Sequence, residues 1–369
     1  MKKLRIGLPP WPYLGYLYTS FLKLIISLDT AKVTPTAGGV ELEARGPDMR
    51  PVLGEAIRYA AELASDYRDR GLRNEFPLSS NDGRWIKPKI LDRLGLPKES
   101  DLLDALNEYA HIVEDIDEKE LENALYPYSR KGEFSPFQVF LLELYSLTRA
   151  PLSDGYYELG LDMNIHQMLI CTAGYVAARH VAARVDNEQV AVLIFPLSLR
   201  VIRYDFYRNL RNSLTSIPGI RPEEAVILWF AIHLPEDFPE DVLVLSVREP
   251  FGPQQTSPVA SIPVHITELR ARAGEAIERL KKIQGIEMLL ETSLKRGGRP
   301  TPDVEDATEY VKLLYLAIQK GFERERLELM LRASRKEAMM ATALDKASAR
   351  RRIIASVARA AASRLMEHP

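Results

Sequence analysis

The sequence predicts an α+β, mostly helical protein, with a small mixed sheet and helices in its N-terminal part and a helical bundle at its C-terminus. The chain has 369 residues, of which 46% are hydrophobic, enough for about two domains with a substantial core. Short apolar runs typical of strands occur before residue 248. After residue 265, apolar residues recur at helical spacing.

The N-terminal segment predicts a strand, a helix and a hairpin, in that order. Residues 3–8 (KLRIGL) predict a short strand. Residues 11–28 are strongly apolar, but Lys23 interrupts them, which favours a core helix over a membrane span. Residues 31–44 alternate around Gly38 and Gly39, as in a β-hairpin.

The middle of the chain mixes predicted helices and strands. Residues 101–122 carry nine acidic side chains and one lysine among spaced apolar residues, which predicts one amphipathic helix with an acidic outer face. That face is either solvated, a protein-binding surface or a mimic of nucleic acid. The runs VAVLIF (190–195) and VLVLSV (242–247) predict buried strands. Further helices are predicted at residues 51–69, 137–147, 165–184 and 199–217.

A change in composition suggests the domain boundaries. Residues 249–264 contain four prolines and no regular periodicity, as expected of a linker. We therefore predict an α+β N-terminal domain at residues 1–248, a Pro-rich linker at 249–264 and a C-terminal helical bundle at 265–369. The bundle is predicted from three apolar stripes, which begin near residues 269, 304 and 344.

Charge and cysteine content exclude several classes of protein. With 49 Lys and Arg against 51 Asp and Glu, the formal net charge is −2, so the chain is not a polycation and any nucleic-acid surface must be a local patch. Its single cysteine, Cys171, excludes an intrachain disulfide framework and fits a reducing compartment, so we expect a cytoplasmic protein with no membrane contact. The chain is rich in arginine and poor in asparagine and glutamine, a composition that is common in heat-adapted proteins.

The first candidate nucleic-acid patch follows the strand 190–195. On a helix over residues 199–217, apolar side chains share one side, and cationic and aromatic ones share the other. Guanidinium groups contact phosphates and aromatic rings stack on unpaired bases. Pairing of these cations with acidic residues of the chain is the competing explanation. The candidate residues are Arg200, Arg203, Tyr204, Tyr207, Arg208 and Arg211.

Three further basic segments are candidates. Residues 332–364 hold nine basic and two acidic side chains, which suits either a phosphate-binding surface or the solvated face of a bundle. Two predicted loops, residues 81–93 and 295–299, are also basic and turn-rich. The tryptophan in the first either stacks on bases, acts as a wedge between them or anchors its own loop. The candidates are Arg332, Arg335, Lys336, Arg352 and Arg359 in the long segment, Arg84, Trp85 and Lys87 in the first turn, and Lys295 and Arg296 in the second.

Catalytic signatures are not recognisable in the sequence. Walker A, HExxH, GxSxG and dinucleotide-binding patterns are missing, so we predict no catalytic residue, no metal site and no cofactor. One weak alternative is a divergent metal-dependent nuclease, because carboxylates and imidazole at four-residue spacing can hold Mg²⁺ or Mn²⁺. The set comprises Asp154, Glu158, Asp162 and His166, and two glycines weaken the helix it needs.

The order of these segments resembles the large subunit of the archaeal type I-A CRISPR interference complex, a Cascade-like surveillance assembly. The resemblance rests on KLRIGL, the apolar helix and the hairpin, then on SRKGEFSPFQ (129–138), on VAVLIF leading into RVIRYDFYRNLRN, and on the helical C-terminal third. It covers the whole chain in length and order.

This resemblance implies a non-catalytic subunit that helps recognise the motif flanking a DNA target and stabilises the opened strands, while base pairing reads the sequence. It implies CRISPR RNA and target DNA as ligands. It also implies an RNA-binding backbone subunit, a small helical subunit, and helicase and nuclease subunits as partners. A structural adaptor that binds only other proteins is the remaining alternative.

Overall fold

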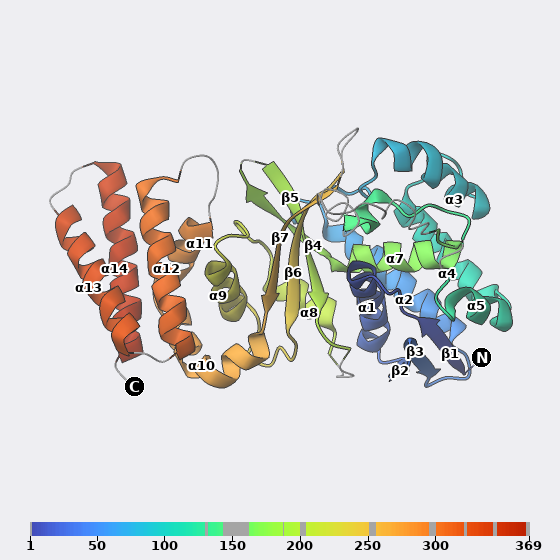
Figure 1. Ribbon diagram of the computed structural model, residues 1–369, viewed down its shortest axis with the longest axis horizontal. Coiled ribbons are helices and arrows are strands. Elements are labelled where there is room, and N and C mark those ends of the chain that lie inside the picture. The colour runs from blue at the N-terminus through green and yellow to red at the C-terminus, as the bar shows by residue number, and fades with distance from the viewer. Residues whose placement is uncertain are drawn as a thin grey trace, which may run out of the picture. The chain divides into compact units, whose positions relative to one another are not determined.

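The computed structural model describes residues 2–129, 132–142, 162–186, 188–199, 204–250, 256–294, 300–320, 323–341 and 345–366 (Figure 1). The chain forms two compact units. The first comprises Met1–Val181, Ala191–Asn212 and Leu243–Ser261. The second comprises Ala182–Val190, Ser213–Val242 and Ile262–Pro369.

The first unit begins with the predicted strand, helix and hairpin. Strand β1 (Lys3–Gly7) pairs antiparallel with β3 (Gly39–Ala44), and β3 pairs with β2 (Ala31–Thr36). Gly38 lies in the hairpin turn with a φ of +81°, a conformation that favours glycine. The prediction of a hairpin at this position is confirmed.

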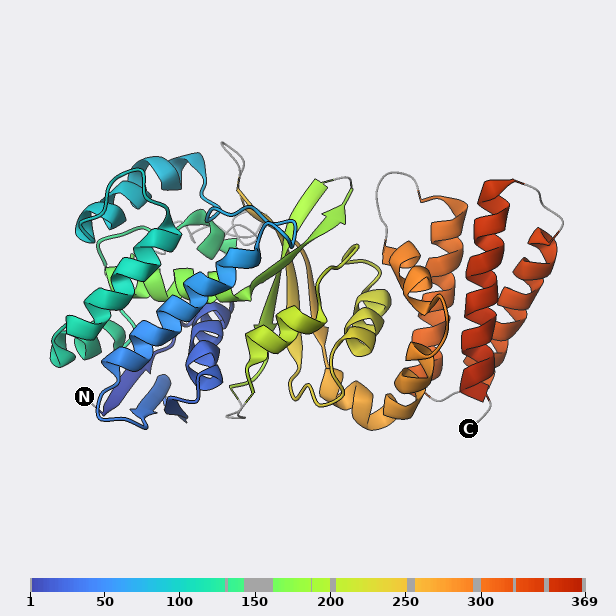
Figure 2. The same ribbon diagram turned by 180° about the vertical axis from the view of Figure 1, so that it is seen from behind.

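Helix α1 (Pro12–Ser27) is mostly buried and packs against α7 (Ile165–Ala178). A Cβ atom at Gly174 of α7 would collide with the backbone oxygen of Leu17 in α1. Glycine therefore permits the close approach of these two helices, which form the centre of the first unit. In Figure 2, α7 runs through the middle of this unit, with α2 (Arg50–Leu63) and α4 (Leu102–Asp115) beside it.

The acidic segment 101–122 forms two helices rather than the single one predicted. Helix α4 ends where Ile116 adopts an extended conformation. Asp117 then caps α5 (Glu118–Leu125), because its carboxylate accepts hydrogen bonds from the backbone N–H groups of Lys119 and Glu120. An aspartate that caps a helix satisfies two otherwise unpaired donors, and here it divides the acidic segment.

The second sheet has the order β4-β5-β6-β7, and both sheets are antiparallel where one mixed sheet is predicted. Strands β5 (Glu188–Pro196) and β6 (Val242–Arg248) confirm the two predicted buried strands. The helix predicted to Arg184 ends at Ala178, and the chain continues as β4 (Arg179–Val185). Strand β7 (Ser257–Val264) occupies half of the predicted linker, so this part of it is ordered sheet.

A buried ion pair lies at the start of β4. The Arg179 side chain is 1% exposed and donates from Nε and Nη2 to the two carboxylate oxygens of Glu249, at 2.6 and 2.7 Å. Its Nη1 donates to the Arg73 backbone oxygen at 2.7 Å, and the Tyr175 hydroxyl donates to Glu249 at 2.8 Å. The guanidinium carbon lies 4.7 Å from the ring centre of Tyr67. This network joins segments of the first unit that are distant in sequence.

The second unit is a helical bundle. Its elements are α9 (Glu223–His233), α10 (Ile266–Lys281), α11 (Ile286–Leu294), α12 (Pro302–Lys320), α13 (Glu323–Met340) and α14 (Lys346–Met366). Asp306 of α12 pairs with Lys336 of α13 at 3.1 Å and with Arg351 of α14 at 2.7 Å. A single carboxylate therefore connects three helices.

The predicted α+β, mostly helical class is confirmed, including the C-terminal helices. The predicted division at residues 248 and 265 stays a prediction, since compactness alone does not show which part folds independently. None of the helices in the described residues has both the length and the apolar character needed to cross a membrane.

Candidate nucleic-acid interface

The first predicted patch does not form the continuous surface that its spacing suggests. Arg200 and Arg203 lie outside the described residues, and α8 covers only Phe206–Ser213. Tyr207 is fully buried and donates its hydroxyl hydrogen to the Ser20 backbone oxygen at 3.3 Å. Arg211 is buried and forms an ion pair with Asp66. Placing Tyr207 and Arg211 on an outward face is therefore wrong.

The remaining members of that patch are partly engaged within the first unit. Arg208 is 67% exposed, but its guanidinium lies 3.5 Å from the Asp205 carboxylate and 5.8 Å from the Tyr59 ring centre. The Tyr59 hydroxyl also donates to Asp205, at 2.7 Å, and burial raises the pKa of Tyr59. Tyr204 is half-buried. This patch offers one exposed cation, already near a carboxylate.

The C-terminal candidates are also mostly paired. Arg332 pairs with Glu309 and Glu328, Lys336 pairs with Asp306, and Arg359 pairs with Glu337 at 2.7 Å. Arg335 and Arg352 are exposed and form no ion pair within the described residues. A paired cation has its charge largely neutralised, so two of these five candidates keep theirs. Lys295 and Arg296 lie outside the described residues.

The turn that contains Trp85 differs from these patches. It is a π-helical turn (Asp82–Ile86) that leads directly into α3 (Lys87–Arg93). Asp82 is buried, and its carboxylate accepts backbone hydrogen bonds from Ser79 at 3.2 Å and Gln138 at 3.1 Å. Burial raises the pKa of Asp82. These contacts fix the base of the turn.

The side chains beyond this anchor face solvent. Trp85 is 61% exposed, so the explanation that it anchors its own loop is wrong. The Arg84 guanidinium carbon lies 5.2 Å from the centre of the Trp85 ring, close enough for a cation–π interaction. An exposed tryptophan is unusual, because burying an indole is strongly favourable.

Cations extend from this tryptophan along α3. Trp85, Lys89 and Arg93 follow at four-residue spacing, which places them along about the same side of the helix. Ile90 and Leu91 bury the opposite side. We call Arg84, Trp85, Lys87, Lys89 and Arg93 the α3 basic surface. Within the described structure, none of its four cations forms an ion pair.

Sequence reasoning found three of these residues and missed Lys89 and Arg93. The four-residue spacing from Trp85 was the available signal. Exposure was not readable from the sequence, because it depends on the contacts of Asp82 with Gln138, 56 residues away.

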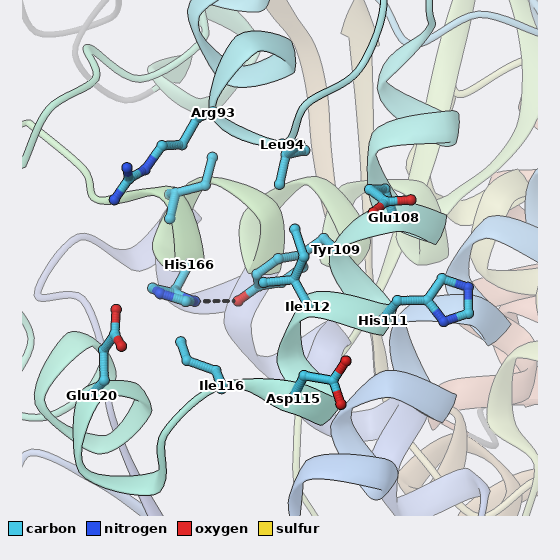
Figure 3. A pocket seen from close by; sticks show the side chains of 11 residues that line it. Arg93, Leu94, Glu108, Tyr109, His111, Ile112, Asp115, Ile116, Glu120 and His166 are labelled. Atoms are coloured by element: carbon cyan, nitrogen blue, oxygen red, sulfur yellow. Dashed lines mark hydrogen bonds between the residues drawn. The ribbon is translucent and has the colours of Figure 1, made fainter.

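A pocket of about 440 Å³ lies at the C-terminal end of α3 (Figure 3). Arg93 and Leu94 contribute to it together with residues of α4, α5 and α7. At its inner wall, the Tyr109 hydroxyl and His166 Nδ1 are 2.8 Å apart. Burial, and secondarily the charge of Arg93, lowers the pKa of His166 to about 4. His166 is therefore neutral at physiological pH.

The predicted metal set is not assembled in the described residues. Asp154 and Glu158 lie outside them, and His166 directs Nδ1 to a tyrosine rather than toward Asp162. In the part of the chain that the structure describes, no group of three or more His, Cys, Asp or Glu side chains is arranged to hold a metal ion.

The buried His166 predicts acid sensitivity. An unfolded histidine has a pKa near 6.5, so below this pH the unfolded chain binds a proton that the folded chain does not. Its contribution to stability is complete above pH 6.5 and is lost as the pH falls toward about 4. We expect protonation of His166 in the unfolded chain to lower the free energy of unfolding by about 2 kcal/mol at about pH 5. Urea unfolding of the wild type and His166→Gln at about pH 7.5 and 5 measures this, and equal pH dependence in both proteins would contradict it.

The comparisons with known proteins agree with a CRISPR context. No curated protein matches the chain. The family model described as CRISPR-associated protein, CsaX, matches residues 42–272, more than half of the chain. The match includes α3, the pocket and all four strands of the second sheet. The chain therefore belongs to the CsaX family of CRISPR-associated proteins.

Proposed function

We propose that this chain is a non-catalytic, nucleic-acid-binding large subunit of a type I-A CRISPR RNA-guided surveillance complex. In this role it helps recognise the target-flanking motif and stabilises the opened target DNA. Membership of a CRISPR-associated family supports the context. The observation that carries the binding function is the 61% exposed Trp85, which lies beside cations without ion pairs.

The chemistry of the α3 basic surface suits an unpaired strand. Cations without carboxylate partners gain most from phosphates, because binding releases the counterions of the nucleic acid and breaks no internal ion pair. An exposed indole ring stacks on any base, and such stacking contributes roughly 1–3 kcal/mol per base. A duplex hides its base faces, so the tryptophan favours single strands or opened DNA.

The partners in this proposal are CRISPR RNA and target DNA, together with the RNA-binding backbone, small helical, helicase and nuclease subunits of the complex. The identity of these partners follows from the family resemblance rather than from a surface of this chain.

A structural adaptor is the second candidate, and a different observation favours it. Leu327, Leu331 and Met339 of α13 and Ile353 of α14 are large apolar side chains between 48% and 60% exposed. Exposed apolar side chains on neighbouring helices are typical of protein-binding surfaces. An adaptor would bind partner subunits equally well after nuclease treatment and would not bind an isolated oligonucleotide.

Replacing Trp85 separates these candidates. Trp85→Ala removes the stacking surface and is expected to weaken binding of a fluorescent thymidine oligonucleotide roughly tenfold. Trp85→Phe keeps an aromatic face and retains most of the affinity. Leu331→Ala, which shortens another exposed apolar side chain, serves as the control and leaves affinity unchanged.

Fluorescence anisotropy gives the dissociation constants of all four proteins. If Trp85→Ala binds as tightly as the wild type, the α3 basic surface is not the binding site. A metal-dependent nuclease is the remaining alternative, and incubation of the same oligonucleotide with Mg²⁺ or Mn²⁺ detects cleavage directly.

A further inference from the structure

The pocket at the end of α3 has one side rich in polar groups. In Figure 3, Arg93, His166 and Glu120 lie toward this side, with His166 between the other two. Glu108 and His111 lie toward the other side of the view. The Glu120 and Arg93 side chains are exposed, and neither forms an ion pair within the described residues. A strong donor and a strong acceptor are therefore available to one ligand.

The charge of the pocket restricts what can enter. Three carboxylates line it, those of Glu108, Asp115 and Glu120, against the single guanidinium of Arg93. His166 adds no charge, because its pKa of about 4 keeps it neutral. A phosphate inside the pocket would be repelled by this negative excess. The occupant is consequently an uncharged or cationic group.

The shape and walls favour a flat, partly apolar ligand. Leu94, Ile112, Ile116 and Ile165 supply aliphatic surface between the polar groups. Ligand pockets usually range from about 300 to 1,000 Å³, so a volume of about 440 Å³ suits one nucleoside rather than a longer ligand. A nucleobase meets these conditions, because its faces are apolar and its edge carries donors and acceptors.

The pocket is also continuous with the α3 basic surface. Arg93 belongs to both, as the last residue of the row that begins at Trp85. The seven residues of α3 span about 10 Å, or about three nucleotide steps at duplex spacing. A strand that stacks on Trp85 and follows the cations of α3 would reach the pocket with its next bases.

We propose that this pocket binds one unpaired guanine of a strand whose phosphates lie along the α3 basic surface. Arg93 donates to O6 and N7 of the base, and Glu120 accepts from N1–H and N2–H. Guanine is the base that presents two adjacent N–H donors to a carboxylate and two acceptors to a guanidinium. Adenine and cytosine each place a ring acceptor where guanine has N1–H, and thymine has only one ring N–H on this edge.

This inference rests on the proposed function, and its test separates the two. Anisotropy measures the affinity of the wild type for a thymidine oligonucleotide and for the same oligonucleotide with one central guanine. We expect roughly tenfold tighter binding of the guanine-containing strand. Glu120→Gln, an exposed substitution that cannot accept both N–H groups, is expected to bring this ratio close to one and to leave thymidine binding unchanged. Glu108→Gln removes the same charge from the other side of the pocket and keeps the preference.

Each other outcome has a definite meaning. If the wild type binds both strands with equal affinity, the guanine pocket is overturned and the proposal for the α3 basic surface stands. The same conclusion follows if the preference for guanine survives Glu120→Gln. If the wild type binds neither strand, the proposed function fails. Free guanosine then decides the pocket by itself: a rise in Tm with guanosine but not with adenosine, lost in Glu120→Gln, supports it, and no rise overturns it.

Discussion

Replacing both Arg84 and Lys89 with glutamate is expected to weaken binding of single-stranded DNA roughly fiftyfold at about 50 mM salt. Each phosphate contact on a single strand contributes about 0.7 to the slope of log affinity against log salt, so losing two contacts lowers the slope by about 1.4. Both side chains are exposed and have no ion pair in the described structure. Their replacement therefore costs binding without breaking an internal ion pair, and within the described residues the contact that it removes is the cation–π contact of Arg84 with Trp85.

The control variant makes the same change of charge at two lysines outside the α3 basic surface. Lys32 and Lys312 are exposed and likewise form no ion pair among the described residues. The Lys32→Glu and Lys312→Glu double variant is expected to keep nearly wild-type affinity and salt slope. Arg335→Glu with Arg352→Glu measures what the C-terminal candidates add. If all three double variants lose affinity equally, binding reflects overall charge rather than a surface on α3.

Arg179→Met is expected to lower the free energy of unfolding by about 3–5 kcal/mol. The substitution removes a fully buried guanidinium and leaves the Glu249 carboxylate, whose side chain is 12% exposed, without its ion-pair partner. It also removes the donor to the Arg73 carbonyl oxygen. Urea unfolding followed by circular dichroism at neutral pH gives the difference.

The double variant Arg179→Met with Glu249→Leu distinguishes the ion pair from packing. Replacing both charges removes the buried carboxylate as well, so much of the lost stability returns. If the double variant loses as much free energy of unfolding as the two single variants together, the two side chains act independently, which would contradict this account.

Local signals predicted most elements of the fold. The β2–β3 hairpin follows from Gly38 and Gly39, and the apolar stripes near residues 269, 304 and 344 became α10, α12 and α14. Strand β4 was missed because its alanines continue the pattern of α7 without a glycine or proline between them. Its conformation depends on long-range contacts such as that of Arg179 with Glu249, 70 residues away.

The candidate site was harder to predict than the fold. Spacing sorts side chains around a helix, but it does not show whether an arginine has an acidic partner distant in sequence. Arg211 forms an ion pair with Asp66, 145 residues earlier, and is part of the core. Arg84 forms no ion pair within the described residues, and its side chain is exposed. Composition ranks these two arginines alike, and only the tertiary structure separates them.

Ultraviolet cross-linking of the wild-type protein to a thymidine oligonucleotide, followed by mass spectrometry of the peptides, tests the binding surface most directly. The account predicts cross-links within residues 82–93, above all at Trp85. Cross-links confined to residues 323–366, or to any surface away from α3, would contradict it.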